Sequence, residues 1–149
     1  MKQPVWLGVD EVAMFHRMLI EDTGGDPGIR DMRRLEAAVQ KARNIYAYGA
    51  ATWGKMAAVY AIGIIKGMPF NDGNKRAGLA VAATFLEING HRLVAPEHEA
   101  VVHVLGLAAG ELSESRFIDW MESRVESGLV EEAAPRRRVK VGKILARRR

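Results

Sequence analysis

The chain has 149 residues and a mass of 16.5 kDa, the size of one ordinary domain. Its 48% of hydrophobic and 27% of charged residues exclude disorder along the whole chain, and the absence of cysteine excludes disulfides, thiolate catalysis and cysteine-based zinc sites. No run reaches the roughly 18 to 20 apolar residues of a membrane helix, and we expect a cytoplasmic protein with neither a secretory signal nor membrane contact.

The formal net charge of +4 is unevenly distributed. Eight basic residues and no acidic one lie between Pro135 and the end of the sequence: Arg136, Arg137, Arg138, Lys140, Lys143, Arg147, Arg148 and Arg149. Without them, 14 basic residues face 18 acidic ones, a net charge of −4. We therefore predict one domain over residues 1–127 and a flexible basic tail over 128–149.

The basic tail has several interpretations. The stretch Arg136–Arg149 suits phosphate contacts with nucleic acid or ribosomes, but no base-reading fold is visible, so nucleic acid is not the favoured partner. A solvated extension and a partner-docking arm remain alternatives.

Apolar residues spaced three and four apart predict an all-α fold. The first two helices are expected over 9–23 and 31–43, separated by a glycine- and proline-rich loop. A tyrosine-containing connector over 44–51 then leads to a third helix over 52–66, which Thr52 can cap. This helix is apolar nearly all round, which is typical of a central buried helix.

A fourth helix is expected over 74–90, with Asn74 as its N-cap and small residues that favour close packing on the third helix. A short extended piece over 91–95 and helices over 96–110 and 113–127 complete the domain. The sequence thus predicts a compact bundle of about six helices around a central buried helix pair.

The loop Gly67–Arg76 carries the chemistry of the sequence. Because it opens a helix, free backbone N–H groups point into it, and Gly73 admits a close ligand. Lys75 and Arg76 add cations, so phosphate is the expected anion, and Asp72 is an acid of the kind that holds Mg²⁺ beside phosphate.

A polar interhelical turn capped by asparagine is the alternative for this loop. Two cations at a helix N-terminus face the positive end of the helix dipole, which argues for a bound anion. Removal of Arg76 should then cost the fold little. Phe70 is apolar within a polar loop, and we expect it to anchor the loop to the core.

The run Met68-Pro69-Phe70-Asn71-Asp72-Gly73-Asn74-Lys75-Arg76 resembles the Fic/Doc motif, His-Pro-Phe-x-Asp-Gly-Asn-x-Arg. Three further segments are similar to death-on-curing proteins of this family: Gly25–Glu36, Phe85–Leu93 and Gly110–Ser113. The resemblance covers roughly Val5 to Val125.

This resemblance implies a helical fold that transfers part of ATP to a protein hydroxyl, with ATP and Mg²⁺ as cofactors. Most members transfer adenylyl, whereas the Doc branch transfers phosphoryl to elongation factor Tu, and Lys75 matches the Doc branch. By the same resemblance, Met68, Asp72 and Arg76 occupy catalytic positions and Asp72 holds the metal. The implied nucleotide-binding residues are Phe70, Gly73, Asn74, Lys75 and Arg76.

Met68 is the main departure from the family pattern, because the family has its general base, a histidine, at this position. Methionine has no titratable group, so proton abstraction is lost, a deficit of roughly 10² to 10⁴ in rate. Engineered disarming and natural divergence to a pseudoenzyme both account for it. His16, His91, His98 and His103 lie on other elements, where we expect packing or surface roles.

Two further features bear on partners. The family's self-inhibitory pattern Ser/Thr-x-x-x-Glu-Gly/Asn is absent, so restraint is expected from a separate antitoxin chain. Tyr46, Tyr48 and Trp53 stand where members have a flap that aligns the target, with ordinary aromatic packing as the alternative. Three hypotheses follow: a Doc-type toxin that is inactive as written, a nucleotide- or target-binding pseudoenzyme, and a nucleic-acid binder that acts through the tail.

Overall fold

The computed structural model describes residues 3–49 and 51–128, and the basic tail from residue 129 onward lies outside them. Six helices and two short strands follow one another in this part of the chain: α1 Val9–Thr23, α2 Met32–Ala47, α3 Trp53–Gly67, α4 Asn74–Ile88, β1 His91–Leu93, α5 Glu97–Ala109, α6 Glu114–Ser123 and β2 Val125–Ser127. The predicted all-α architecture is confirmed.

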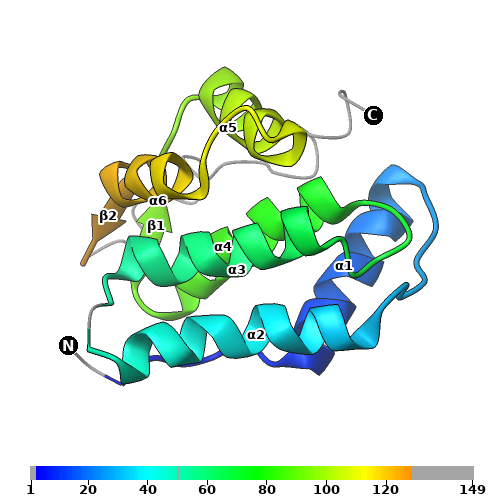
Figure 1. Ribbon diagram of the computed structural model, residues 1–149, viewed down its shortest axis with the longest axis horizontal. Helices are drawn as coiled ribbons and strands as arrows, with labels where there is room; N and C mark the ends of the chain where they lie inside the picture. Colours follow the sequence, from blue (N-terminus) through cyan, green and yellow to red (C-terminus); the bar gives the residue numbers. More distant parts are fainter. Residues whose placement is uncertain (1–2, 50, 129–149) are drawn as a thin grey trace.

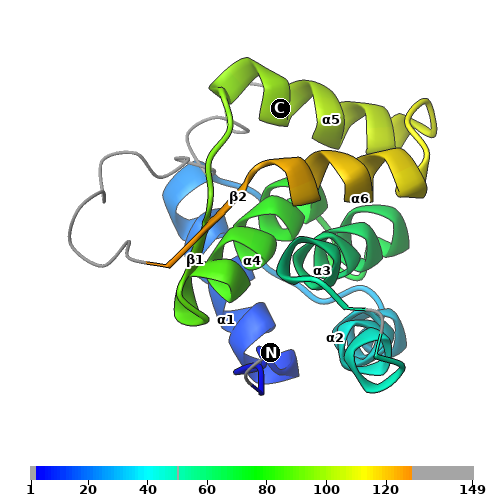
Figure 2. The ribbon, with the colours of Figure 1, turned by 90° about the vertical axis from the view of Figure 1, so that its left-hand side faces the viewer.

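Helices α3 and α4 form the centre of the bundle (Figures 1 and 2). Helix α2 packs along one side of α3 and α6 along another, while α1 lies against α4. Ten of the fifteen residues of α3 are buried, which confirms the predicted central helix. Thr52 caps α3 as predicted, since its side chain accepts a hydrogen bond from the N–H of Lys55.

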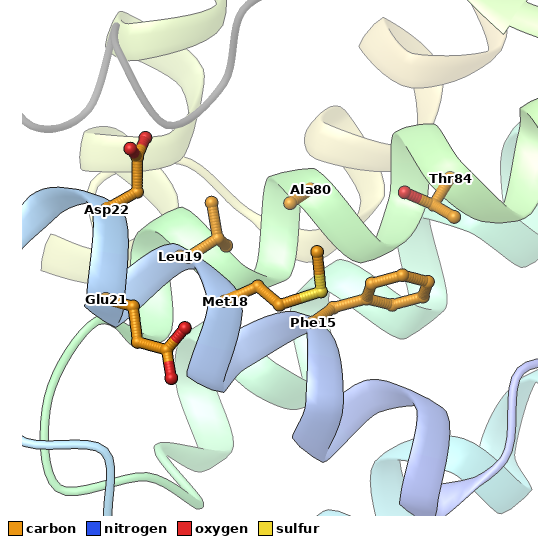
Figure 3. Close-up of a pocket in the computed structure, with 7 residues that line it drawn as sticks. All are labelled: Phe15, Met18, Leu19, Glu21, Asp22, Ala80 and Thr84. Atoms are coloured by element: carbon orange, nitrogen blue, oxygen red, sulfur yellow. The ribbon is translucent and has the colours of Figure 1, made fainter.

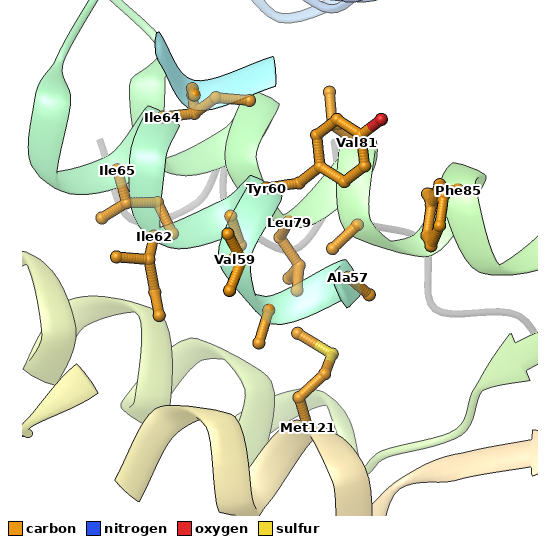
Figure 4. Packing of buried hydrophobic residues seen from close by; sticks show 14 of the residues in the cluster. Ala57, Val59, Tyr60, Ile62, Ile64, Ile65, Leu79, Val81, Phe85 and Met121 are labelled. Atoms are coloured by element: carbon orange, nitrogen blue, oxygen red, sulfur yellow. The ribbon is translucent and has the colours of Figure 1, made fainter. Parts of the chain in front are cut away.

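The core fills the space between these helices with large apolar side chains. Figure 4 shows Tyr60, Ile62 and Ile65 of α3 among residues of α4 and α6, and these core residues are all buried. Close approach of the helices depends on glycine. A Cβ on Gly78 would lie 2.6 Å from a side-chain carbon of Ile65, and one on Gly63 would lie 2.6 Å from the Cβ of Ala38.

Two predicted helix boundaries are wrong. Helix α2 continues to Ala47, one turn beyond the predicted end at Arg43, because Ile45 and Tyr46 pack against the core and Tyr46 meets Trp6 edge-on, with ring centroids 5.8 Å apart. This contact outweighs the turn-forming character of the sequence.

Helix α6 ends at Ser123, although the apolar spacing predicts a helix to residue 127. Val125–Ser127 forms β2 instead, antiparallel to β1, with Leu93 opposite Val125 and His91 opposite Ser127. The buried Leu93 and a two-stranded ladder give this segment partners that a further helical turn would lack.

A clamp of polar side chains joins α5 to α6. Glu99 accepts hydrogen bonds from Trp120 Nε1 at 2.7 Å and from Arg124 Nε at 2.6 Å, and the Arg124 contact lowers the pKa of this carboxyl. The clamp fixes α6, which in turn covers α3. Within the described part of the chain, no helix is both long and apolar enough to cross a bilayer.

Candidate nucleotide site

The loop between α3 and α4 begins at Met68, which ends α3 in the left-handed conformation with φ 52° and ψ 56°. Two arginines, one just before α2 and one in its first turn, hold the end of this helix. Arg30 donates to the carbonyl of Met68, and Arg34 Nη1 donates to that of Gly67 at 2.9 Å. These cations suit the negative end of the α3 dipole. The Met68 side chain is 50% exposed at the entrance to the loop.

Phe70 and Asn74 give the loop its internal support. Phe70 is 1% exposed, so it anchors the loop to the core as predicted. The amide of Asn74 accepts from the N–H of Phe70 and donates to its carbonyl, both at 3.0 Å. The N-cap of α4 is Gly73, at φ 75°, and the prediction that Asn74 caps this helix is wrong. The Asn74 side chain braces the loop and does not point its amide outward.

Asp72 presents its carboxylate at the positive end of α4. The side chain is 48% exposed, one oxygen accepts from the N–H of Gly73 at 2.8 Å, and the same oxygen lies 3.7 Å from Arg76 Nη2. Gly25 packs against the other oxygen so closely that a Cβ there would lie 2.5 Å from it. The connector between α1 and α2 thus fixes the position of this carboxylate.

Arg76 is buried, with 5% of its surface exposed. Its Nη1 atom donates to the hydroxyl of Thr23 and, at 3.2 Å, to the carbonyl of Gly24. Arg76 therefore ties α4 to the C-terminal end of α1. The burial and these hydrogen bonds contradict the picture of an exposed cation at the helix start. We therefore expect removal of Arg76 to destabilise the fold, because the hydrogen bonds should outweigh the repulsion from the helix dipole.

Lys75, by contrast, has an exposed side chain in the first turn of α4. The first turn of an α-helix also has backbone N–H groups without a partner inside the helix, so a phosphate at this helix end could meet these groups and the ammonium of Lys75 together. No three His, Cys, Asp or Glu side chains cluster anywhere in residues 3–49 and 51–128. A single carboxylate such as that of Asp72 is nevertheless enough for Mg²⁺, which commonly takes one or two carboxylates together with phosphate oxygens and water.

A short strand-like segment flanks the loop. Ile29 and Phe70 form an antiparallel bridge. Beside it, the carbonyl of Pro69 accepts a hydrogen bond from the N–H of Arg30 at 2.7 Å. The carbonyl of Gly28 accepts one from the N–H of Asn71 at 3.0 Å. The segment beside the motif loop is therefore 28–31, at the end of the glycine- and proline-rich connector between α1 and α2.

The aromatic residues considered for a target-aligning flap lie elsewhere. Trp53 begins α3, whereas Met68 follows its last residue, and Trp53 packs on Phe85 and on His91, the latter with ring centroids 4.6 Å apart. Tyr46 packs on Trp6, and Tyr48 is 86% exposed. For Trp53 and Tyr46, ordinary aromatic packing is the correct interpretation.

His16 is the residue near the loop that sequence reasoning missed. It lies on the inward face of α1, is 1% exposed, and its Nε2 atom is 2.7 Å from the carbonyl oxygen of Asp72. Burial lowers its pKa. The signal was a histidine at the centre of an apolar helix face, with Val12 and Ile20 one turn away on either side.

A groove runs between α1 and α4. Phe15, Met18 and Leu19 of α1 face Ala80 and Thr84 of α4 across it, and its volume is about 580 Å³ (Figure 3). Met18 is 56% exposed, and the carboxylates of Glu21 and Asp22 stand on the rim. Exposed apolar side chains with a polar rim are typical of a protein-docking surface.

The loop joins the central helix pair of the bundle and places the motif residues around the N-terminus of α4. The sequence that forms this arrangement matches a known protein family. Residues 6–86, more than half of the chain, match the model of the Fic/DOC family. The chain therefore belongs to the Fic/Doc family, as the motif indicated. It is also similar to "Protein kinase doc" of Escherichia phage P1: 34% of residues are identical over 111 residues, which cover 74% of this chain and 87% of the phage protein.

Proposed function

We propose that the chain is a Doc-type toxin of a toxin–antitoxin module that binds Mg²⁺·ATP at the start of α4 and is inactive as written. The observation that carries this proposal is the loop itself: Asp72 and Lys75 flank the open N-terminus of α4, while Met68 stands at the entrance. Bound Mg²⁺·ATP would supply a phosphoryl group for a protein hydroxyl.

Different residues of the loop would bind the metal and the phosphates of Mg²⁺·ATP. Asp72 would hold Mg²⁺, while Lys75 and the N–H group of Asn74 would hold phosphate oxygens. The N–H of Gly73 is donated to the Asp72 carboxylate and would keep that ligand in place. A base at position 68 would take the proton of the target hydroxyl as its oxygen bonds to the γ-phosphorus and the bond to ADP breaks. The thioether of Met68 is only a weak acceptor and cannot take this proton, so binding is retained while transfer is lost.

Transfer of phosphoryl is favoured over transfer of adenylyl. Lys75 occupies the position where the general Fic pattern has glycine, and the phage P1 relative is named a protein kinase. The expected target is elongation factor Tu, whose modification would inhibit translation. A nucleotide-binding pseudoenzyme is the second candidate, and Met68 is the observation that favours it.

Replacing Lys75 tests the nucleotide site. Loss of one charge-assisted contact should weaken Mg²⁺·ATP binding by about ten- to a hundredfold, measured by isothermal titration calorimetry on the Lys75→Ala variant. Because the side chain is exposed, the melting temperature should stay near that of the parent.

Lys41→Ala is the matched control, since it removes an exposed cation from the middle of α2 and should leave binding unchanged. Equal affinity of the Lys75→Ala variant and the parent would contradict the phosphate site. So would the absence of any binding by the parent at millimolar nucleotide.

The cognate antitoxin, which this proposal requires, would bind in the groove between α1 and α4. A segment with apolar side chains for Phe15 and Met18, and basic ones for the rim of Glu21 and Asp22, fits this groove. Glu21 and Asp22 lie in the last turn of α1, next to Thr23 and Gly24, which Arg76 of α4 holds, so an antitoxin bound at this end of the groove would lie near the start of α4.

Met18→Asp puts a charge among the apolar residues that line the groove. In a co-expression pull-down, this change should abolish co-purification with the product of the neighbouring gene. Val102→Asp is the control, because Val102 is 62% exposed on α5, away from the groove. Equal recovery of the neighbouring gene product with both variants would exclude the groove as the antitoxin site.

A further inference from the structure

The side chain of His16 makes one hydrogen bond within the described part of the chain. Its side chain is fully buried on α1, and its Nε2 atom lies 2.7 Å from the carbonyl oxygen of Asp72. A carbonyl only accepts, so Nε2 carries the hydrogen and donates it. The Nδ1 atom is buried without a hydrogen-bond partner in the described residues, which agrees with a neutral ring whose one N–H is committed to Asp72.

The ring of His16 also touches the loop at a second point. It stacks on Phe70 with ring centroids 3.7 Å apart and planes 4° from parallel. Phe70 and Asp72 are two residues apart, so one side chain of α1 supports the loop on both sides of Asn71. Neither contact belongs to the Fic/Doc motif run, since His16 is 52 positions before Met68 in the sequence.

The hydrogen bond from His16 fixes the orientation of one peptide group. Because the peptide is planar and trans, the N–H of Gly73 points away from the carbonyl that His16 holds. That N–H is donated to the Asp72 carboxylate at 2.8 Å. Gly73 stands at φ 75°, and glycine lets this peptide rotate at little cost when nothing holds it. The bond from His16 thus sets both the direction of the N–H of Gly73, the N-cap residue of α4, and the place of the carboxylate.

We propose that His16 is a positioning residue for the nucleotide site: its hydrogen bond to the carbonyl of Asp72 fixes the conformation of the loop at the start of α4. This inference rests on the proposed binding of Mg²⁺·ATP to the loop. His16 would touch neither phosphate nor metal. It aligns the Asp72–Gly73 peptide, whose N–H in turn holds the Asp72 carboxylate at the start of α4.

Two substitutions separate the contacts that His16 makes. His16→Phe keeps an aromatic ring for the stack on Phe70 and removes the donor. His16→Gln keeps a donor at about the reach of Nε2 and removes the stack. Calorimetry with Mg²⁺·ATP should show binding about tenfold weaker for His16→Phe, with binding by His16→Gln within about threefold of the parent. Thermal melts run alongside report any loss of fold.

Amide hydrogen exchange gives a readout without nucleotide. The N–H groups of Gly73 and Asn74 should exchange faster in His16→Phe than in the parent, whereas those in the middle of α4 should not change. A merely structural role would lower the melting temperature in both variants and leave this pattern absent.

Each outcome decides the inference. Equal affinity of the parent and His16→Phe, equal weakening in both variants, or unchanged exchange at Gly73 and Asn74 would overturn the role of His16 while the nucleotide site stands. Failure of the parent to bind Mg²⁺·ATP would overturn the nucleotide site and this inference together.

Discussion

Met68→His is expected to convert this protein into one that arrests growth when it is expressed without its antitoxin. Position 68 lies in the left-handed region, where histidine is more frequent than most other residues, and its carbonyl is already held by Arg30. The side chain is half exposed, so an imidazole there has access to a bound target. A general base contributes roughly 10² to 10⁴ in rate, which is the expected gain in transfer.

Growth of cells with inducible copies of the parent and of Met68→His is the measurement. Met68→Gln is the matched control, because it brings a polar side chain of similar length that cannot serve as a base. Equal, unimpaired growth of all three strains, with soluble protein confirmed in each, would count against a retained toxin scaffold. Arrest by the glutamine variant would show that polarity at position 68, and not a base, is what matters.

Arg76→Ala is expected to lose stability. Its guanidinium is buried and donates to Thr23 and Gly24, so truncation removes charge-assisted hydrogen bonds to the end of α1, at about 1.5 to 3 kcal/mol of unfolding free energy. Relief of the helix-dipole repulsion returns at most about 1 kcal/mol. Urea denaturation should therefore show a lower midpoint.

Lys75→Ala is the control for this experiment, because it removes the same charge from the same helix end at an exposed position. Comparison of the two midpoints isolates the contacts of Arg76 from the effect of charge. Identical midpoints for both variants would mean that the link between α4 and α1 contributes nothing to stability.

The local pattern of the sequence was enough to predict most of the helices. Helix α1 has the predicted limits, because its apolar spacing and its closing glycines act within one turn. The errors occur where distant partners decide. Tyr46 stays helical because it meets Trp6, and Val125 turns to a strand because Leu93 lies opposite. Neither partner is visible within a window of a few residues.

The candidate site divides in the same way. The loop residues from Met68 to Arg76 were found from the motif and from the chemistry of a helix N-terminus. The supports of the loop were not, since His16 and Arg30 come from other elements and reach it only in the folded chain. The burial of Arg76 was missed for the same reason. The local sequence predicts an exposed cation at a helix start, and only the folded chain brings the end of α1 over it.

The most direct test of the central claim, an intact nucleotide site without a base, is the mass of elongation factor Tu after incubation with ATP and Mg²⁺ and either the parent or Met68→His. We predict that the factor gains one phosphate with Met68→His and stays unmodified with the parent over the same time. Modification at equal rates by both proteins would contradict the claim. So would an unmodified factor beside a folded Met68→His protein that binds Mg²⁺·ATP.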